Sequence, residues 1–347
     1  MTIKGRGASW NPQNRFESLE YVRDEEAVPE DGDSSPRTLY LRDPSRTIIA
    51  TNDSPDIGFD ASINPYRGCE HGCIYCYARP THEYLGFSAG LDFETKILVK
   101  EDAPQLLREE LNKKSWTPKV IAISGVTDPY QPVEKRLGIT RGCLEVLADF
   151  RNPVGVITKN HLVTRDVDVF QELARYDAAK VFVSITTLDS KAARTMEPRT
   201  SSPEMRLAAV ETLASAGVPV GVMVAPVVPG ITDHEMPAIL AAAKKAGAKW
   251  AGFVVLRLPW AVAPLFEQWL EEHYPDRKDK VLNRVRDLRG GKLYDAKWGV
   301  RGRGEGIFAD QIQMLFDVAC RKHGLNEERF ELSTASFRRR GLQGSLW

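Results

Sequence analysis

Residues 64–80 read NPYRGCEHGCIYCYARP and contain three of the chain's five cysteines. Cys69, Cys73 and Cys76 have the spacing Cx3Cx2C, with glycines and tyrosines between and beside them. In a reducing compartment, thiolates at this spacing bind a soft metal or a metal cluster more readily than they form a disulfide. The stretch therefore predicts a metal site with three cysteine ligands and no fourth cysteine nearby.

Three kinds of metal site are compatible with these ligands. Structural zinc needs four protein ligands, and His71 or His82 would complete a Cys3His site. An electron-carrying [4Fe-4S] cluster normally has four cysteine ligands, but Cys143 and Cys320 are remote in sequence and fit buried helical positions better. A [4Fe-4S] cluster on three cysteines leaves one iron open, and an open metal position is where substrates and cofactors bind.

The composition sets limits on the protein as a whole. The chain has 347 residues, enough for a large core, with 47 Lys and Arg against 47 Asp and Glu, so no overall field attracts it to nucleic acid or an anionic membrane. No apolar run approaches the roughly 20 residues of a membrane span, and the first residues lack the apolar core of a signal peptide. These features predict a cytoplasmic protein that does not associate with membranes.

From about residue 61 the sequence alternates short runs rich in Val and Ile with longer helical patterns, which is typical of repeated β/α units around a parallel sheet. Strands this apolar throughout are expected to be covered on both faces. The expected strands are 61–66, 119–125, 153–160, 180–187, 218–228 and 250–258. The expected helices between them are 103–114, 140–150, 166–176, 202–217 and 233–247. Six such units predict an α/β fold, a partial (βα)6 TIM-like barrel.

The barrel is expected to carry an extension at each end. Residues 1–60 form a polar N-terminal extension with a flexible tract at 29–37 and two short strand candidates, TLYLRD and TIIA. Residues 61–260 form the barrel core. Residues 261–347 form a mainly helical extension, in which two helical patterns flank the basic, glycine-rich stretch 297–306.

Polar residues end several of the expected strands, where α/β barrels place their active sites. Thr127 and Asp128 follow the second strand, Lys159 ends the third, and Ser184 and Thr186 share one face of the fourth. A lysine at the end of an apolar strand suits a carboxylate ligand. We interpret these five residues as cofactor-binding, the alternative being a turn for Asp128, a solvated Lys159 and ordinary strand residues at the other positions.

The segment 194–206 after the fourth expected strand contains four more charged residues, Arg194, Glu197, Arg199 and Arg206. They fit contacts with substrate or with a cofactor carboxylate. They fit a solvated loop equally well.

The loop that begins at Cys69 resembles the CxxxCxxC loop of the radical S-adenosylmethionine superfamily. Residues 62–86, SINPYRGCEHGCIYCYARPTHEYLG, resemble its spore photoproduct lyase-like branch, which is also called DNA-repair-photolyase-like. The resemblance implies a [4Fe-4S] cluster on the three cysteines, with S-adenosylmethionine on the fourth iron. It further implies an enzyme that cleaves S-adenosylmethionine reductively to a 5′-deoxyadenosyl radical, which abstracts hydrogen from a substrate, and a reductant such as flavodoxin or ferredoxin.

The resemblance also assigns roles to single residues. Thr127, Lys159 and Ser184 match cofactor-contacting positions of the lyase group, and Tyr75 matches the residue beside adenine. Tyr75 and Tyr77 match the tyrosines that flank the third cluster cysteine of the lyase, which implies catalytic roles in a hydrogen relay.

One part of that lyase is absent from this sequence. The lyase returns hydrogen to its product from a cysteine on the loop after the second strand, and residues 125–128 here read GVTD. A DNA-repair reaction is therefore not implied. A nucleic-acid substrate is one interpretation of the basic stretches 284–305 and 337–340, and solvated surface is the other. The alternative function is a nucleic-acid-binding protein with a structural Cys3His zinc site.

Overall fold

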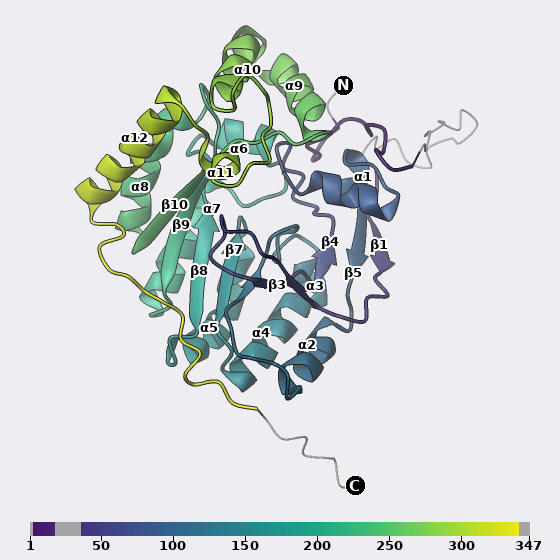
Figure 1. Cartoon of the computed structure of the whole chain (residues 1–347), viewed down its shortest axis with the longest axis vertical. Coiled ribbons are helices and arrows are strands. Elements are labelled where there is room, and N and C mark those ends of the chain that lie inside the picture. The colour runs from purple at the N-terminus through teal and green to yellow at the C-terminus, as the bar shows by residue number, and fades with distance from the viewer. Residues whose placement is uncertain (1–2, 18–35, 340–347) are drawn as a thin grey trace.

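The computed structural model describes residues 3–17 and 36–339, so most of the expected flexible tract at 29–37 and Arg340 of the last basic stretch lie outside the described residues. A seven-stranded sheet has the order β10-β9-β8-β7-β6-β3-β2 (Figure 1). Its first six strands pair in parallel, and β2 pairs antiparallel with β3. Among the described residues no pairing joins β10 to β2, so the barrel is partial, as expected.

All six expected strands are present. They are β3 (Ala61–Ile63), β6 (Ile121–Ile123), β7 (Val154–Thr158), β8 (Ala179–Ser184), β9 (Val220–Val227) and β10 (Trp250–Val255). The edge strand β2 (Ile49–Thr51) overlaps the strand candidate TIIA. In β7 the side chains alternate between buried and half-buried, because the inner face of an incomplete barrel is only partly covered.

A small second sheet has the order β1-β5-β4. It consists of β1 (Leu39–Arg42), which lies in the TLYLRD candidate, β5 (Lys96–Val99) and β4 (Tyr66–Arg67). The sequence analysis missed β5, whose four residues directly follow the short helix α1 (Leu91–Thr95). Because β4 ends one residue before Gly68, this sheet fixes the start of the cysteine-rich loop.

The five helices expected between the strands cover the outer face of the sheet. They are α2 (Ala103–Asn112), α4 (Ile139–Phe150), α5 (Val167–Ala174), α7 (Pro203–Ser215) and α8 (Met236–Lys245). The start of α7 follows its sequence signal, since the Ser202 hydroxyl accepts a hydrogen bond from the Met205 amide. Shorter elements are α3 (Glu134–Leu137), α6 (Ser190–Met196), η1 (Arg79–Leu85), η2 (His161–Asp166), η3 (Asp233–Glu235) and η4 (Pro275–Arg277).

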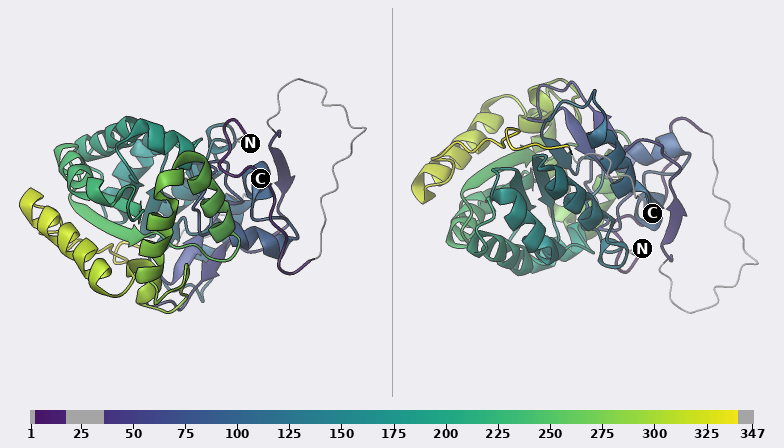
Figure 2. Two further views of the ribbon diagram at one scale, coloured as in Figure 1. Left: turned by 90° about the horizontal axis from the view of Figure 1, so that it is seen from above. Right: turned by 90° about the horizontal axis from the view of Figure 1, so that it is seen from below.

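The C-terminal part contains α9 (Val262–His273), α10 (Lys278–Asp287), α11 (Val300–Arg303) and α12 (Ile307–His323). Helices α10 and α12 were expected from the sequence, whereas α9 was not. Figure 2 shows the curved wall of β/α units from both ends, with α12 on its outside. No helix among the described residues is long and apolar enough to cross a membrane.

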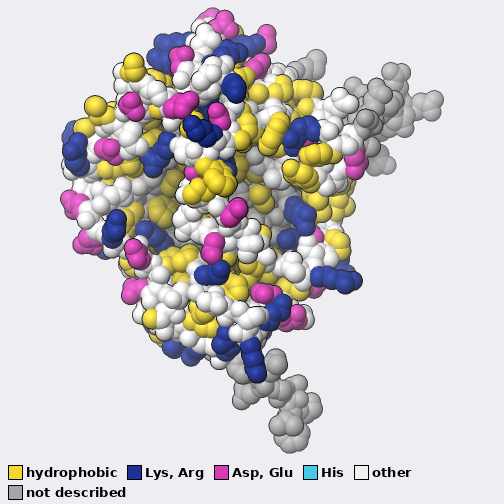
Figure 3. All heavy atoms as spheres, viewed as in Figure 1, with side chains coloured by type: hydrophobic (Ala, Val, Ile, Leu, Met, Phe, Trp, Pro, Cys, Tyr) yellow, Lys and Arg dark blue, Asp and Glu magenta, His cyan; other side chains and the backbone are white. Residues whose placement is uncertain are grey.

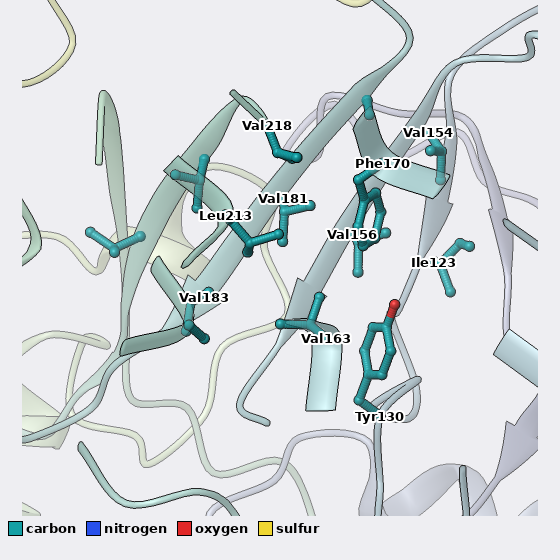
Figure 4. Packing of buried hydrophobic residues seen from close by; sticks show 14 of the residues in the cluster. Ile123, Tyr130, Val154, Val156, Val163, Phe170, Val181, Val183, Leu213 and Val218 are labelled. Atoms are coloured by element: carbon teal, nitrogen blue, oxygen red, sulfur yellow. The ribbon is translucent and has the colours of Figure 1, made fainter. Parts of the chain in front are cut away.

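The main core lies between the sheet and its helices (Figure 4). Val156 and Val181 of neighbouring strands pack with Phe170 of α5 and Leu213 of α7, and all four side chains are fully buried. Burying a side chain of this size contributes about 1.5–3 kcal/mol to folding. Cys143 lies in the same core and is fully buried, which agrees with the packing role expected for it.

Candidate active site at the cysteine loop

The cysteine loop, residues 68–79, lies at the end of the sheet where β8 and β10 lead to α6 and α9 (Figure 1). Cys69 and Cys73 are buried and Cys76 is half-buried. The Ile74 amide donates to the Met196 carbonyl at 3.0 Å, which joins the loop to the segment after α6. Among the described residues, no three His, Cys, Asp or Glu side chains converge tightly enough to chelate a single metal ion.

Two glycines let the loop fold tightly, as their positions in the sequence suggest. Gly68 and Gly72 have φ angles of 81° and 68°, a region that residues with a side chain rarely adopt. A Cβ atom on Gly72 would lie 2.7 Å from a carboxylate oxygen of Glu94. The loop is therefore folded tightly against Glu94.

A buried ion pair supports the loop from behind. The Arg79 guanidinium donates to the carbonyls of Gly72 and Cys73 at 3.2 and 3.0 Å and pairs with Glu94. The Glu94 carboxylate also accepts hydrogen bonds from the amides of Gly7 and Ala8. The sequence analysis missed this support, since a single arginine after the third cysteine has no recognisable signal.

Neither histidine completes a zinc site. His71 Nδ1 lies 3.4 Å from an Asp128 carboxylate oxygen, and its Nε2 lies 3.1 Å from the Asn160 side-chain nitrogen. His82 Nε2 lies 3.0 Å from the Lys96 carbonyl, and burial lowers the pKa of His82 to about 4. The Cys3His arrangement considered from the sequence is not formed by the described residues.

Thr127 and Asp128 lie beside the cysteine loop, but their polar atoms form hydrogen bonds with other residues of the protein. The Thr127 hydroxyl donates to the Gly68 carbonyl at 2.8 Å. The Asp128 carboxylate accepts from the Thr158 hydroxyl at 2.7 Å and from the Lys159 amide at 2.8 Å. These two residues therefore tie the loop after β6 to the cysteine loop and to the end of β7.

The other three expected cofactor residues converge with Glu197 in one group, the lysine cluster (Lys159, Ser184, Thr186 and Glu197). The Lys159 ammonium donates to the Ser184 hydroxyl at 2.6 Å and to the Ala225 carbonyl at 2.7 Å, and it lies 3.3 Å from Thr186. It is also 3.5 Å from the Glu197 carboxylate. Burial, helped by the positive charge of Arg206, lowers the pKa of Lys159 to about 8.

Glu197 connects the lysine cluster to the cysteine loop. Its carboxylate accepts hydrogen bonds from the hydroxyls of Tyr75 and Thr186 and forms an ion pair with Arg206. Glu197 and Arg206 are both 1% exposed, so the solvated-loop interpretation is wrong for these two residues. Burial raises the pKa of Glu197, and the charge of Arg206 opposes that rise.

The two tyrosines of the loop point to different surroundings. Tyr75 is buried against the lysine cluster, with the Lys159 ammonium 5.9 Å from its ring centroid. Tyr77 is 46% exposed, and its hydroxyl donates to the Gly125 carbonyl at 2.7 Å. The Arg257 guanidinium lies 4.1 Å from the Tyr77 ring centroid. Tyr77 therefore belongs to the exposed edge of the site.

The thiols fit a positively charged metal cluster. Burial raises the pKa of Cys76 to about 11 and that of Cys73 well above its ordinary value. Thiolates in this loop thus need a nearby cation, and iron supplies that charge when it displaces the thiol protons. Two buried cysteines and one half-buried cysteine in a tightly folded loop agree with a three-cysteine cluster.

Several arginines of the basic stretches have protein partners. Arg284 and Arg301 form ion pairs with Asp233 and Asp56 at 3.3 and 2.6 Å, and Arg289 is buried. In the other stretch, residues 338–339 donate to backbone carbonyls of residues 114, 116 and 149, near the ends of α2 and α4.

An incomplete (βα)6 barrel with three cysteines in one loop at its mouth defines a class of enzymes that bind an iron-sulfur cluster there. A family model described as the Radical SAM superfamily matches residues 63–243, and the chain belongs to this superfamily. It is therefore a radical enzyme that uses a [4Fe-4S] cluster and S-adenosylmethionine.

Two relatives extend the comparison. An uncharacterized protein of Mycobacterium tuberculosis is 37% identical over 232 residues, which are 66% of this chain and 67% of that protein. An uncharacterized protein of Methanocaldococcus jannaschii is 28% identical over 223 residues, 64% of this chain and 80% of that protein. Both matches span about two thirds of this chain.

The fold is shared with solved structures of spore photoproduct lyase. The complex with dinucleoside spore photoproduct has a TM-score of 0.57 and 17% identity, and the match covers 82% of this chain and 80% of the lyase. A mutant of the same lyase gives a TM-score of 0.57 at 18% identity. The expected fold class is thereby confirmed.

Proposed function

We propose that this chain holds the [4Fe-4S] cluster on Cys69, Cys73 and Cys76, binds S-adenosylmethionine against the lysine cluster, and abstracts hydrogen from a substrate at the mouth of the barrel. One observation carries the proposal: three thiols of one loop, two of them buried and one half-buried, adjoin a convergent polar group from the ends of β7 and β8 and the segment after α6. The Tyr75 hydroxyl, which hydrogen-bonds to Glu197, joins the two.

The cluster, once reduced, supplies the electron that splits S-adenosylmethionine into methionine and a 5′-deoxyadenosyl radical. The residues of the chain bind and orient the cofactor. Lys159 binds its carboxylate, since a desolvated ammonium held by Ser184 and the Ala225 carbonyl is already fixed in place. Thr127 and Asp128 contribute by positioning the cysteine loop and Lys159.

Tyr75 and Tyr77 have separate roles in this proposal. Tyr75 borders the cofactor, because its buried hydroxyl is held by Glu197. Tyr77 faces the substrate and returns a hydrogen atom to the product radical from its hydroxyl, in a site where residues 124–128 offer no thiol. The resulting tyrosyl radical recovers one electron and one proton from water and a reductant of the flavodoxin or ferredoxin class, which fits a cytoplasmic location.

We propose a nucleotide-containing substrate. Spore photoproduct lyase, which shares the fold, has been solved with a dinucleoside photoproduct. In this chain the support comes from the exposed edge around Tyr77, where arginines and aromatic rings alternate. The reaction differs from that of a lyase with a cysteine on the loop after the second strand.

Anaerobic reconstitution tests the radical chemistry. We expect the protein to bind about four irons and, when reduced, to convert S-adenosylmethionine into 5′-deoxyadenosine and methionine. Replacing any of Cys69, Cys73 or Cys76 by Ala should abolish both properties. Cys320→Ala is the matched control, because Cys320 is a buried thiol on α12 outside the site. Colourless, iron-free protein that is saturated by one zinc ion would contradict the proposal.

A further inference from the structure

A row of exposed aromatic rings and one arginine runs along the mouth of the barrel; we call it the aromatic rim (Tyr84, Phe16, Arg15, Trp260 and Tyr294). Tyr84 and Phe16 are stacked with ring centroids 4.7 Å apart. The Arg15 guanidinium lies 4.9 Å from the Phe16 centroid and 4.2 Å from that of Trp260. Trp260 and Tyr294 follow at 5.5 Å. The row thus joins four separate parts of the chain.

The rim is exposed although its members are large and apolar. Tyr84, Phe16 and Trp260 are 70%, 54% and 53% exposed. Trp260 has a φ of 45°, a left-handed conformation that a bulky residue rarely adopts. On the face shown in Figure 3, hydrophobic side chains gather between α11 and α1. Exposed rings in a continuous row indicate a binding surface.

The rim adjoins the cysteine loop. Tyr84 belongs to η1, which begins at the last residue of that loop. Trp260 follows Arg257 by three residues, and the Arg257 guanidinium lies 4.1 Å from the ring centroid of Tyr77. A ligand that lies along the aromatic rim therefore reaches the exposed side of the cysteine loop.

Positive charge without a carboxylate partner lies at the same place. Arg257 forms no ion pair among the described residues, and its Nε atom is buried without a hydrogen-bond partner. Arg289 also forms no ion pair there, and its two terminal nitrogens donate to the carbonyls of Val300 and Leu256. Burial, followed by the positive charge of Arg257, lowers the pKa of Arg289 to about 10. An anion beside the Arg257 guanidinium would relieve this repulsion.

Arg15 of the rim pairs with Glu83 at 2.7 Å, which leaves Arg257 as the cation without an ion pair beside the rings. Stacking rings and such a cation together recognise a particular chemistry. Every nucleobase has a flat face that stacks on aromatic side chains or on a guanidinium, and every nucleotide of a strand carries one phosphate. Protein partners also favour aromatic residues and arginine. A protein surface, however, would not need an unpaired cation at the point where the ligand meets the cysteine loop.

We propose that the aromatic rim and Arg257 form a binding site for single-stranded nucleic acid, with bases stacked along the rim and a phosphate held by Arg257 beside Tyr77. This inference rests on the proposed function in one respect, namely that the bound strand is the substrate of the radical. It adds which residues hold the substrate and requires the strand to be unpaired, because bases inside a duplex cannot stack on protein rings.

Fluorescence anisotropy of the reconstituted full chain tests the site. The probes are fluorescein-labelled single-stranded DNA and RNA of about 12 nucleotides, a matching DNA duplex and a mononucleotide. We expect Trp260→Ala to weaken binding of the single strands roughly tenfold. Arg257→Gln should weaken binding and lower the slope of log affinity against log salt by about 0.7, the value for one phosphate contact on a single strand.

Matched controls separate the site from general effects. Met314→Ala on α12 and Arg175→Gln after α5 remove an exposed apolar side chain and an exposed arginine elsewhere, and both should bind like the wild type. Trp260→Phe should retain most of the affinity, because a flat ring remains. Circular dichroism and iron content show whether each variant is folded and loaded.

The outcomes distinguish this inference from the proposed function. Equal affinities of wild type, Trp260→Ala and Arg257→Gln overturn the inference, as does a failure to bind any single strand by protein that still forms 5′-deoxyadenosine. Equal affinity for duplex, or for the mononucleotide, also overturns it. Binding that depends on both residues in protein that never cleaves S-adenosylmethionine supports the site and contradicts the radical assignment.

Discussion

The lysine cluster and the outer edge of the site, formed by the aromatic rim and Arg257, both contain charged side chains. The two regions differ in whether these side chains have protein partners. In the lysine cluster each polar side chain has a protein partner: Lys159 is held by Ser184, and Glu197 is held by Arg206 and Tyr75. At the outer edge, Arg15 of the aromatic rim pairs with Glu83, but the neighbouring Arg257 forms no ion pair among the described residues and Trp260 is half exposed. Side chains that protein partners already hold in place suit binding of the cofactor, which is the same in every turnover. Side chains without such partners suit binding of a substrate.

The largest effect on stability is expected at Glu197 in the lysine cluster. Glu197→Gln leaves the charge of Arg206 buried without its partner, and breaking a buried ion pair on one side costs about 3–5 kcal/mol. We expect a corresponding loss of unfolding free energy in chemical denaturation. Glu204→Gln, an exposed carboxylate at the start of α7, is the control and should cost no more than about 1 kcal/mol. Equal stabilities of the two variants would show that the ion pair between Glu197 and Arg206 does not stabilise the lysine cluster.

Lys159 should matter for cofactor binding more than for folding. Lys159→Met removes a charge-assisted contact with the cofactor carboxylate and should weaken S-adenosylmethionine binding about ten- to hundredfold, which corresponds to about 1.5–3 kcal/mol. Equilibrium dialysis or calorimetry measures this. Lys180→Met, a lysine of β8 that lies 4.1 Å from the Trp250 ring, is the control. Unchanged affinity in Lys159→Met would remove the residue from the cofactor site.

The pH dependence of cofactor binding is a second test of Lys159 as the residue that binds the cofactor carboxylate. With a pKa of about 8, lowered from 10.5 by burial and by Arg206, Lys159 loses its charge as the pH rises through 8. The affinity for S-adenosylmethionine should therefore fall above pH 8, by up to about tenfold per unit. In Lys159→Arg the charge persists, so the fall should disappear. A wild-type affinity that stays constant between pH 7 and 9.5 would contradict this role.

Tyr77 at the edge of the rim should give the smallest effect on stability. Tyr77→Phe removes one hydrogen bond to the Gly125 carbonyl, a loss of about 0.5–1.5 kcal/mol. It should leave the cleavage of S-adenosylmethionine intact while product formation from the natural substrate falls. Tyr75→Phe, by contrast, disturbs the buried Glu197 and should weaken cofactor binding. Identical behaviour of the two variants would remove the distinction between inner and outer tyrosine.

The sequence contained strong signals for the barrel and for the cluster loop. Five of the six strands follow from apolar runs rich in Val and Ile, β3 lies in the stretch ASINPY, and Ser202 marks the start of α7 as expected. The short strand β5 was missed because four residues after a one-turn helix have no readable period. Helix α9 was missed as well, although its buried face includes Phe266 and Trp269.

The sequence predicted only those residues of the site that lie at the carboxyl ends of strands. Lys159, Ser184 and Thr186 do converge, because the carboxyl ends of parallel strands meet at one edge of a sheet. Glu197 was named but not chosen, since a sequence does not tell whether a charged loop residue is buried. The aromatic rim was invisible for a different reason: Arg15 and Trp260 are 245 positions apart, and only the fold brings them together.

The ion pair between Arg79 and Glu94 has a consequence for how the protein matures. The Glu94 carboxylate accepts from the amides of Gly7 and Ala8, while the Ile74 amide reaches the Met196 carbonyl. The cysteine loop is thus closed by contacts that span the first 196 residues, and contacts between distant parts of a chain form late in folding. A nascent chain that stops before α6 has the three thiols but not all the contacts that close their loop. Iron delivery should accordingly follow synthesis of the fourth β/α unit.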